Sequence, residues 1–323
     1  MQPIPAVGRS LLWGLPMVAL LLAPQALAEQ PRELLSRMAE AALEQNYHGS
    51  FVYERTGSFT THNIWRKAAG DQSEERMLQA DGEPNEWLRR NGHLVCSSSL
   101  GAGARWNKNA EPLSGQADML HHWYSLQVLG NTRVADRLVT VLAVQPRDSY
   151  RYAYELYLDS ETGLLLKSLL INERDTLLER FQFASLQLGE PSADDLQPGS
   201  ACLPLPERAS EETELSERWQ PAWLPPGFAL GQYEIRTMNG GSTEVVAQAF
   251  TDGLARFTLF IEPLGDDSLA GDLRAQLGPT VAVSRKLNMP DGAFLATVVG
   301  EIPGSAAERI AASLAPDFEE QEQ

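Results

Sequence analysis

The chain has 323 residues, of which 43% are hydrophobic and 21% charged. This length allows two domains with their own cores, and the apolar fraction is too high for a disordered protein. Lysine and arginine number 26 against 43 aspartates and glutamates, which gives a formal net charge of −17. That charge argues against unaided binding to nucleic acid or to an anionic lipid surface, because both require a basic footprint. It is compatible with docking on a basic protein.

The N-terminus has the features of a secretory signal peptide. Arg9 and the free amine precede an apolar stretch at residues 11–22, and Ala26-Leu27-Ala28 is a small-x-small cleavage pattern. We expect residues 1–28 to be the signal, with cleavage after Ala28. A membrane anchor is the alternative, but two prolines interrupt the segment and a span needs about 20 apolar residues. No cysteine follows for lipid attachment, so the mature chain is expected to be exported and soluble.

The first domain is predicted to begin with a helix from Pro31, which suits a first helical turn, to about Gln45. Strand patterns then dominate. Thr56-Gly57, Asp81-Gly82 and Asn91-Gly92 are hairpin signals, because type I′ turns need positive φ at both central positions. The expected strands are 50–55, 58–66, 75–79, 86–90, 93–96, 124–129, 138–145, 152–159, 164–172 and 177–188. This pattern predicts a large antiparallel sheet that is strongly curved or partly closed.

A segment rich in proline and acidic residues follows, and we interpret 191–220 as an interdomain linker. The alternative is an irregular part of one large domain. Residues 29–190 would then form the first domain and 221–318 a small α+β domain, with 319–323 as a tail. The predicted strands of the small domain are 229–237, 243–250, 255–262, 280–287 and 293–302, with turns at Asp252-Gly253 and Asp291-Gly292. Ser305 and Glu308 fit the capping box of a closing helix, in which Ile310 and Leu314 face inward.

Motifs of catalysis are absent from the sequence. There is no Gly-x-Ser-x-Gly elbow, no His-Glu-x-x-His, no phosphate loop and no paired Cys-x-x-Cys. His121 and His122 would point to opposite sides of a strand, which does not make a metal pair. Asp194-Asp195 and Asp266-Asp267 lie in loop-like sequence and are better interpreted as solvated charges than as acid/base pairs. We therefore expect no enzyme activity, no cofactor and no metal site.

Cys96 and Cys202 are the only cysteines. In an exported protein two thiols usually form one disulfide. The link would close a loop of roughly 107 residues, for which the chain-entropy treatment gives about 4–5 kcal/mol. It would also fix the start of the linker to a strand of the first domain. Two free cysteines are the alternative.

Large apolar side chains alternate along the strands of the first domain. With one or two helices to cover it, a curved sheet could leave part of its concave face open to an apolar ligand. An ordinary filled core is the alternative. The candidates for such a cavity are Phe51, Tyr53, Phe59, Trp65, Trp87, Tyr154, Leu156, Leu158, Leu164 and Leu166.

Several ordered segments resemble the periplasmic sigma-E regulators of the RseB/MucB family. They are FVYER at 51–55 with GSFTTH at 57–62, LYLD at 156–159, TGLLLKS at 162–168, WLPPGF at 223–228, DGLARF at 252–257, QLGPT at 276–280 and GEIP at 300–303. The resemblance covers nearly the whole mature chain. It is closest to the MucB branch, which regulates AlgU-type sigma factors and hence alginate production, and in which cysteines occur at similar places.

The resemblance implies a large domain like the lipoprotein carriers LolA and LolB, an unclosed β-barrel filled by helices, and a smaller C-terminal domain. It implies a periplasmic protein that binds the periplasmic region of an RseA/MucA-like membrane anti-sigma factor and protects it from regulated proteolysis. Lipopolysaccharide or mislocalised lipoprotein would release that protection, and self-association into dimers or larger oligomers is expected.

Two readings stay open beside this one. A periplasmic lipid or lipoprotein carrier would use the same barrel, although carriers of that type have a single domain, and an exported enzyme has only the loop acids behind it. Arg256 and Phe257, next to the Asp252-Gly253 turn, are candidate partner contacts. Their alternative is a charge at a strand end and a core aromatic.

Overall fold

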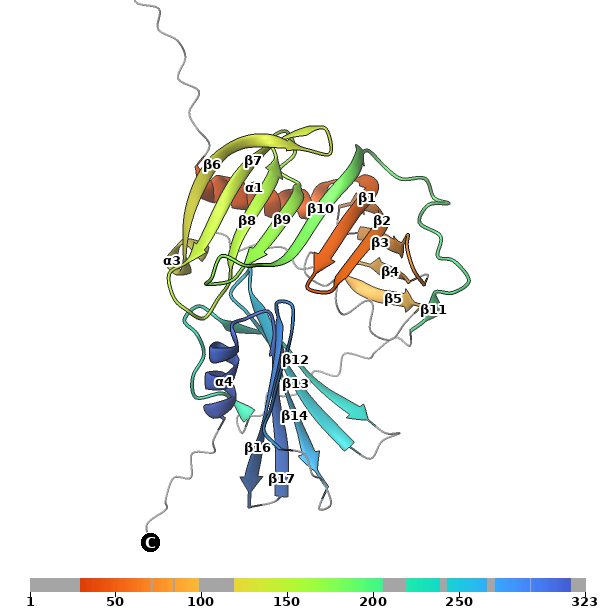
Figure 1. Cartoon of the computed structure of the whole chain (residues 1–323). Coiled ribbons are helices and arrows are strands. Elements are labelled where there is room, and N and C mark those ends of the chain that lie inside the picture. The colour runs from red at the N-terminus through yellow and green to blue at the C-terminus, as the bar shows by residue number, and fades with distance from the viewer. Residues whose placement is uncertain are drawn as a thin grey trace, which may run out of the picture.

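The computed structural model describes residues 30–70, 72–83, 85–98, 119–205, 219–238, 243–265, 271–290 and 292–314 (Figure 1). Several expectations lie outside these residues: the signal peptide and its cleavage at Ala28, Asp266-Asp267, part of the predicted linker, Asp291 and the tail at 319–323. Among the described residues, no helix has the length and apolar character needed to cross a bilayer.

Helix α1 (Pro31–Glu44) confirms the first predicted element, with Pro31 in its first turn. Its buried side chains are Leu34, Leu35, Met38, Ala39 and Ala41. They recur at helical spacing and so form one apolar stripe. The helix packs against β2 and β6, and Figure 1 shows the first sheet curving around it.

The first sheet has eleven strands in the order β11-β5-β4-β3-β2-β1-β10-β9-β8-β7-β6. Neighbouring strands are antiparallel throughout. The terminal strands β6 and β11 do not pair with each other in the described part of the chain, so the sheet is unclosed. The strands are β1 Tyr47–Arg55, β2 Ser58–Ala69, β3 Gln72–Gln79, β4 Glu86–Arg90, β5 His93–Ser97, β6 Tyr124–Val134, β7 Arg137–Pro146, β8 Ala153–Asp159, β9 Leu165–Ile171, β10 Leu177–Leu188 and β11 Leu203–Pro204.

The second sheet has six antiparallel strands in the order β12-β13-β14-β17-β16-β15. The strands are β12 Ala229–Met238, β13 Thr243–Thr251, β14 Arg256–Leu264, β15 Leu273–Leu277, β16 Thr280–Met289 and β17 Gly292–Gly300. Helix α4 (Gly304–Ala312) packs against β16 and β17. Together the two sheets confirm the predicted fold class, which is mainly antiparallel β with a large unclosed sheet and a smaller α+β domain. The sequence reading missed β15.

The predicted capping box of the last helix is wrong. The residue that caps α4 is Pro303, without a side-chain hydrogen bond, and Ser305 already lies inside the first turn. Glu308 forms an ion pair with Arg274 on β15 and so does not reach back to the helix start. The inward side of the helix is as predicted, since Ile310 and Leu314 are buried.

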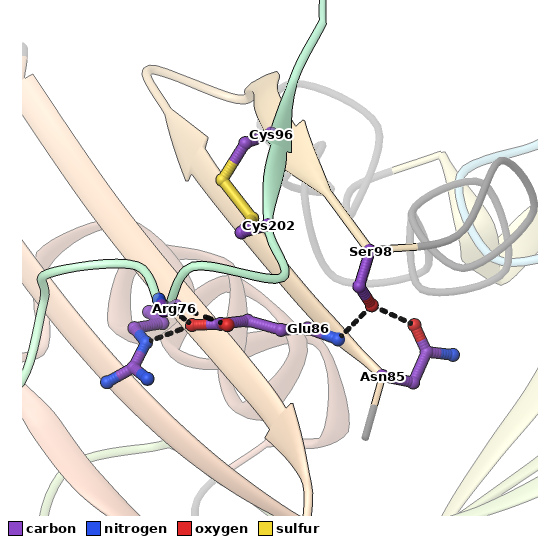
Figure 2. Close-up of a disulfide and its surroundings, with 7 residues drawn as sticks. Arg76, Asn85, Glu86, Cys96, Ser98 and Cys202 are labelled. Carbon is purple, nitrogen blue, oxygen red and sulfur yellow. Dashed lines mark hydrogen bonds and ion pairs between the residues drawn. A yellow bond between two sulfur atoms is a disulfide. The ribbon is translucent and has the colours of Figure 1, made fainter. Parts of the chain in front are cut away.

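The first part of the predicted linker, residues 191–205, is fixed along the edge of the first sheet (Figure 2). The Cys96–Cys202 disulfide is confirmed, with Cα atoms 5.3 Å apart. The buried Glu86 carboxylate accepts the N–H of Gly199 at 2.9 Å and Nε of Arg76 at 2.7 Å. Strand β11 then pairs with β5. This segment is therefore structurally part of the first domain.

Candidate functional site at the domain seam

The two domains meet along a seam built from loops at the ends of their strands. On the first domain, the β7–β8 loop carries Tyr150 and Arg151, while helix α3 (Leu120–Trp123) leads into Tyr124 of β6. On the second domain, the seam is formed by residues 226–228 and by the β13–β14 turn at Asp252.

A buried ion pair lies in the middle of this seam. Arg151 Nε donates to Asp252 Oδ2 at 2.6 Å, and both side chains are 0% exposed. The hydroxyl of Tyr124 donates to the same oxygen at 2.9 Å. The other oxygen, Oδ1, accepts the N–H groups of Leu254 and Ala255 at 2.9 and 2.8 Å, which fixes the turn. Asp252 therefore holds its own turn and binds the other domain at once.

The groups around Asp252 keep the protonation states that this contact needs. Burial, and then the Asp252 carboxylate, raise the pKa of Tyr124 well above its usual value, so the phenol remains a donor. Burial alone would lower the pKa of Arg151, but its hydrogen bond to Asp252 and the carboxylate charge outweigh burial and raise that pKa. Arg151 also pairs with Asp148 and donates to the carbonyl of Pro226. Removing one partner of an ion pair that is this deeply buried strongly destabilises the fold, because the other charge is left buried without compensation.

Apolar side chains cross the seam in both directions around the ion pair. Leu254 of the second domain packs against a first-domain cluster that contains Leu34 and Leu35. Tyr150 of the first domain packs against the core of the second. Arg309 on α4 donates to the Tyr150 hydroxyl at 2.6 Å and lies over the Trp223 ring, 3.9 Å from its centroid. Each domain thus contributes to burying the other's core.

Gly227 is required by the same packing. Its φ is +87°, and a Cβ built on it would lie 2.2 Å from Nε1 of Trp123 on α3. Both the left-handed backbone and the close approach of the indole exclude a larger residue.

A second contact lies next to the turn of the β1–β2 hairpin. Arg55 donates to the Thr280 hydroxyl at 2.7 Å and lies 3.6 Å from both Glu301 and Glu179. The Tyr53 hydroxyl donates to Glu179, and its pKa is raised by burial and then by that carboxylate. Arg55 thereby links a carboxylate of each domain, so the seam is fixed at two places.

The side chains of the seam hold the two domains in one relative orientation. Its charged groups are directed at one another and at backbone atoms. Among the described residues, no group of three or more histidine, cysteine, aspartate or glutamate side chains is arranged to hold a metal ion. Interfaces between domains of one chain usually permit relative motion unless they are large and apolar. Here a buried ion pair and interlocked aromatic side chains oppose it.

The expected cavity residues fall into two buried clusters. Phe51, Trp87, Leu164 and Leu166 belong to one cluster, with Tyr53 packed against it. Leu156 and Leu158 belong to another, with Tyr154 packed against it.

Phe59 and Trp65 lie elsewhere. Phe51 pairs with His62 across β1 and β2, so odd-numbered residues of β2 lie on the opposite face of the sheet. Phe59 is 61% exposed, and the guanidinium of Arg76 lies 4.9 Å from the Trp65 ring. The residue that accompanies Phe51 is His62, which stacks on it with centroids 5.1 Å apart and whose pKa burial lowers to about 4. In the sequence, the spacing of His62 two residues before the apolar Ile64, which is also buried, was the signal that could have predicted the burial of His62.

The two candidate partner contacts are placed differently. Phe257 is 1% exposed and packs against Phe250 and Phe228, with centroids 5.0 and 5.4 Å away, so it has no surface to offer a partner. Arg256 is half-buried at the first position of β14.

The histidine pair lies in a helix, although the sequence suggested a strand. His121 and His122 belong to α3, and their ring centroids are 3.9 Å apart. Consecutive helical residues are about 100° apart, so their rings are not driven to opposite sides as on a strand.

A cleft of about 450 Å³ lies at the ends of strands β2, β3 and β4, and its lining residues belong to neither of these clusters. It is lined mainly by polar residues, including Lys67, Glu74 and Arg90, together with Leu196. Its charges are already paired, Arg90 with Glu74 at 2.8 Å and Lys67 with Glu190.

Comparisons with known proteins identify relatives of both domains. Residues 30–202 match the MucB/RseB N-terminal domain, and residues 213–315 match the MucB/RseB C-terminal domain. The sigma factor AlgU regulatory protein MucB of Pseudomonas aeruginosa is 44% identical over 303 residues, which are 93% of this chain and 95% of that protein. The sigma-E factor regulatory protein RseB of Haemophilus influenzae is 26% identical over 91% of this chain and 94% of its own.

Solved structures agree with these relatives. A crystal structure of MucB in complex with MucA(peri) is 43% identical and has a TM-score of 0.75, covering 89% of this chain and 99% of that one. A second solved structure, a crystal structure of MucB, is 42% identical, with a TM-score of 0.66 over 88% and 97% of the two chains.

Proposed function

This chain belongs to the MucB/RseB family, and we propose on that basis that it is a periplasmic negative regulator of an envelope-stress sigma factor. It binds the periplasmic region of a membrane anti-sigma factor and protects that region from regulated proteolysis. The observation that carries this proposal is the relation to a MucB solved together with MucA(peri), which spans both domains.

The seam supports this role because it presents two domains to a partner as one surface. A partner that touches both domains binds more tightly when their orientation is fixed beforehand, since less freedom is lost on binding. The chain carries 43 acidic against 26 basic residues, so a partner segment with basic and apolar residues fits it best. Binding should therefore weaken as salt concentration rises.

We propose further that a lipid acyl chain, from lipopolysaccharide or a mislocalised lipoprotein, releases the anti-sigma factor. The apolar interior of the first sheet, around Phe51, Trp87 and Leu166, has the chemistry to take such a chain. These side chains are buried in the present conformation, so the acyl chain gains room only by displacing α1 or opening the sheet. Release follows if the lipid binds the free protein better than the complex.

The test uses residues 29–323 and the periplasmic region of Pseudomonas aeruginosa MucA, mixed with and without lipid A and measured by calorimetry. We expect one-to-one binding without lipid and its loss with saturating lipid A. The deacylated lipid A sugar is the matched control and should leave binding unchanged. Absence of binding without lipid would overturn the regulator proposal, whereas binding that lipid A leaves intact would overturn only the release step.

A protection assay examines the second half of the function. MucA cleavage by the protease that starts its degradation should slow when this chain is added, and lipid A should restore the rate. The carrier alternative gives a different result: lipid that copurifies in equal amount with the protein, and no effect on MucA cleavage.

A further inference from the structure

The cleft at the ends of β2, β3 and β4 lies on the outer face of the first sheet. Met77 and Trp87 face the buried interior. Because side chains alternate along a strand, Glu74 of β3 and Arg90 of β4 lie on the opposite face. Lys67 of β2 is paired with Glu74, and Glu74 with Arg90. These three side chains therefore form one row across three neighbouring strands, with the acid between the two cations.

The linker segment 191–205 forms the opposite wall of the cleft. The disulfide and the Glu86 carboxylate fix its far part (Figure 2). Arg76 fixes its near part by donating to the carbonyl of Asp195 at 2.8 Å, and Leu196 is only 4% exposed. The cleft is therefore preformed, and its volume of about 450 Å³ lies within the range of about 300–1,000 Å³ that is usual for ligand sites. A ligand would not have to order either wall when it binds.

Both cations of the row can bind an anionic ligand. Arg90 donates to Glu74 through Nε at 2.8 Å, and its two Nη atoms have no acceptor in the described part of the chain. Lys67 pairs with Glu190, but the two side chains are 41% and 57% exposed. An ion pair this exposed contributes little to stability, so a ligand carboxylate can take the place of Glu190.

The other lining groups fit the end of a peptide better than a bare anion. They comprise apolar side chains and side-chain amides, and an amide both donates and accepts hydrogen bonds, as a peptide bond does. The apolar residues are Ala69, Ala193 and Leu196, and the amides are Gln72, Asn91 and Gln197. A phosphate or sulfate ion would use neither the apolar surface nor the amide acceptors.

We propose that this cleft binds a short peptide by its free C-terminal carboxylate. Lys67 and Arg90 hold the carboxylate, and the last side chain of the peptide, which is apolar, lies against Leu196. With Glu74 between them the two cations carry a net charge of +1, which matches one carboxylate better than a doubly charged phosphate. Hydrolysis of a peptide bond releases such an end, so the ligand class is the products of proteolysis.

The cleft is separate from the buried ion pair of the seam and from the two buried clusters of the first sheet. The inference therefore goes beyond the proposed function and does not depend on it.

An NMR titration of the mature protein with three probes tests the ligand class. The first probe is acetyl-Gly-Ala-Leu with a free carboxylate, for which we expect a Kd on the order of 0.1–1 mM. The second is the same peptide with a C-terminal amide, which should bind at least about tenfold more weakly because it lacks the charge that the two cations hold. The third is sodium phosphate, which should also bind at least about tenfold more weakly, since it has no apolar part.

Substitutions in the cleft test its location. Lys67→Gln and Arg90→Gln change exposed side chains, so both variants should fold, and each should raise the Kd of the free acid about fivefold or more. Lys286→Gln removes an exposed lysine of the second domain and should leave the Kd unchanged. Ala193→Trp fills the cleft from the linker side and should abolish binding, while the disulfide still holds the segment.

Four results would overturn the proposal. The free acid and the amide could bind equally well, which would remove the role of the carboxylate. Phosphate could bind as tightly as the free acid, which would leave a site for small anions only. The free acid could fail to bind the wild-type protein at about 10 mM, or it could bind Lys67→Gln, Arg90→Gln and Ala193→Trp as tightly as wild type, which would place its site elsewhere.

Discussion

Replacing Asp252 by asparagine tests whether the buried ion pair holds the two domains together. The asparagine keeps an oxygen that can accept the N–H groups of Leu254 and Ala255, so the β13–β14 turn should survive. Its amide nitrogen would instead face Nε of Arg151 and the hydroxyl of Tyr124, both of which are donors. The change therefore removes the interdomain contact and leaves a buried guanidinium with less compensation.

The magnitude follows from the burial of both partners. Removing one partner of a fully buried pair costs about 3–5 kcal/mol. Arg151 keeps Asp148, whose side chain is 23% exposed, and the carbonyl of Pro226. We therefore expect the lower end, about 3 kcal/mol, which is roughly a 150-fold shift of the equilibrium between closed and open domains.

Urea unfolding combined with small-angle X-ray scattering measures this effect. Asp252→Asn should lower the free energy of unfolding and increase the radius of gyration, and a double-mutant cycle with Arg151→Met should give a coupling of about 2–3 kcal/mol. Glu161→Gln is the matched control: its carboxylate also pairs with an arginine but is 80% exposed, so under about 0.5 kcal/mol is expected. A coupling no larger than that of the control would refute the locking role of the pair.

Three further changes probe other parts of the structure. Cys96→Ala with Cys202→Ala should cost about 4.7 kcal/mol through the loop that the disulfide closes, and reduced wild type should show the same urea midpoint; a midpoint indifferent to reductant would contradict this. Because burial lowers the pKa of His62 to about 4, against about 6.5 when unfolded, protons bind the unfolded chain preferentially between these values. Stability present above pH 6.5 should thus be lost toward pH 4, by up to about 1.4 kcal/mol per pH unit, and equal slopes in wild type and His62→Gln would rule out this source. Gly227→Ala should lower the free energy of unfolding in urea by about 1–3 kcal/mol more than Gly57→Ala does. Both glycines have positive φ, but only at Gly227 would the added Cβ clash with a neighbour, the Trp123 indole. Similar losses for the two variants would show that the indole moves aside at little cost.

Strands and turns were predictable where local signals and the core agree. Asn91 and Gly92 have φ of +50° and +78°, as a type I′ turn requires, and the strands around them begin and end close to the expected residues. β15 escaped because all five of its side chains are exposed, so no alternation against a core marks it. The start of α4 was misplaced because Ser305 and Glu308 match a capping pattern, whereas Arg274 competes for the glutamate.

The disulfide was predictable from the sequence, whereas the contacts of the seam were not. Two cysteines in a chain that is expected to be exported suffice to predict a disulfide. Arg151 and Asp252 are 101 positions apart, and no local pattern relates an arginine after a strand to an aspartate in a turn. The sequence marked Asp252 as a turn residue. That role accounts for Oδ1, which accepts the backbone N–H groups of the turn, but not for Oδ2, which contacts the other domain.

The shift in population that release requires sets a lower limit on the length of the acyl chain that could cause it. Reversing a two-state equilibrium from 99:1 to 1:99 takes a ligand that favours one state by about 5.5 kcal/mol. Burial of one methylene contributes about 0.8 kcal/mol, so a releasing chain must bury at least about seven methylenes that the closed protein leaves in water. Acyl chains of six carbons or fewer should therefore fail to displace MucA at any attainable concentration, and chains of twelve or more should succeed. If short chains release MucA as well as long ones do, the signal is read from the headgroup and the apolar interior of the first sheet is only a core.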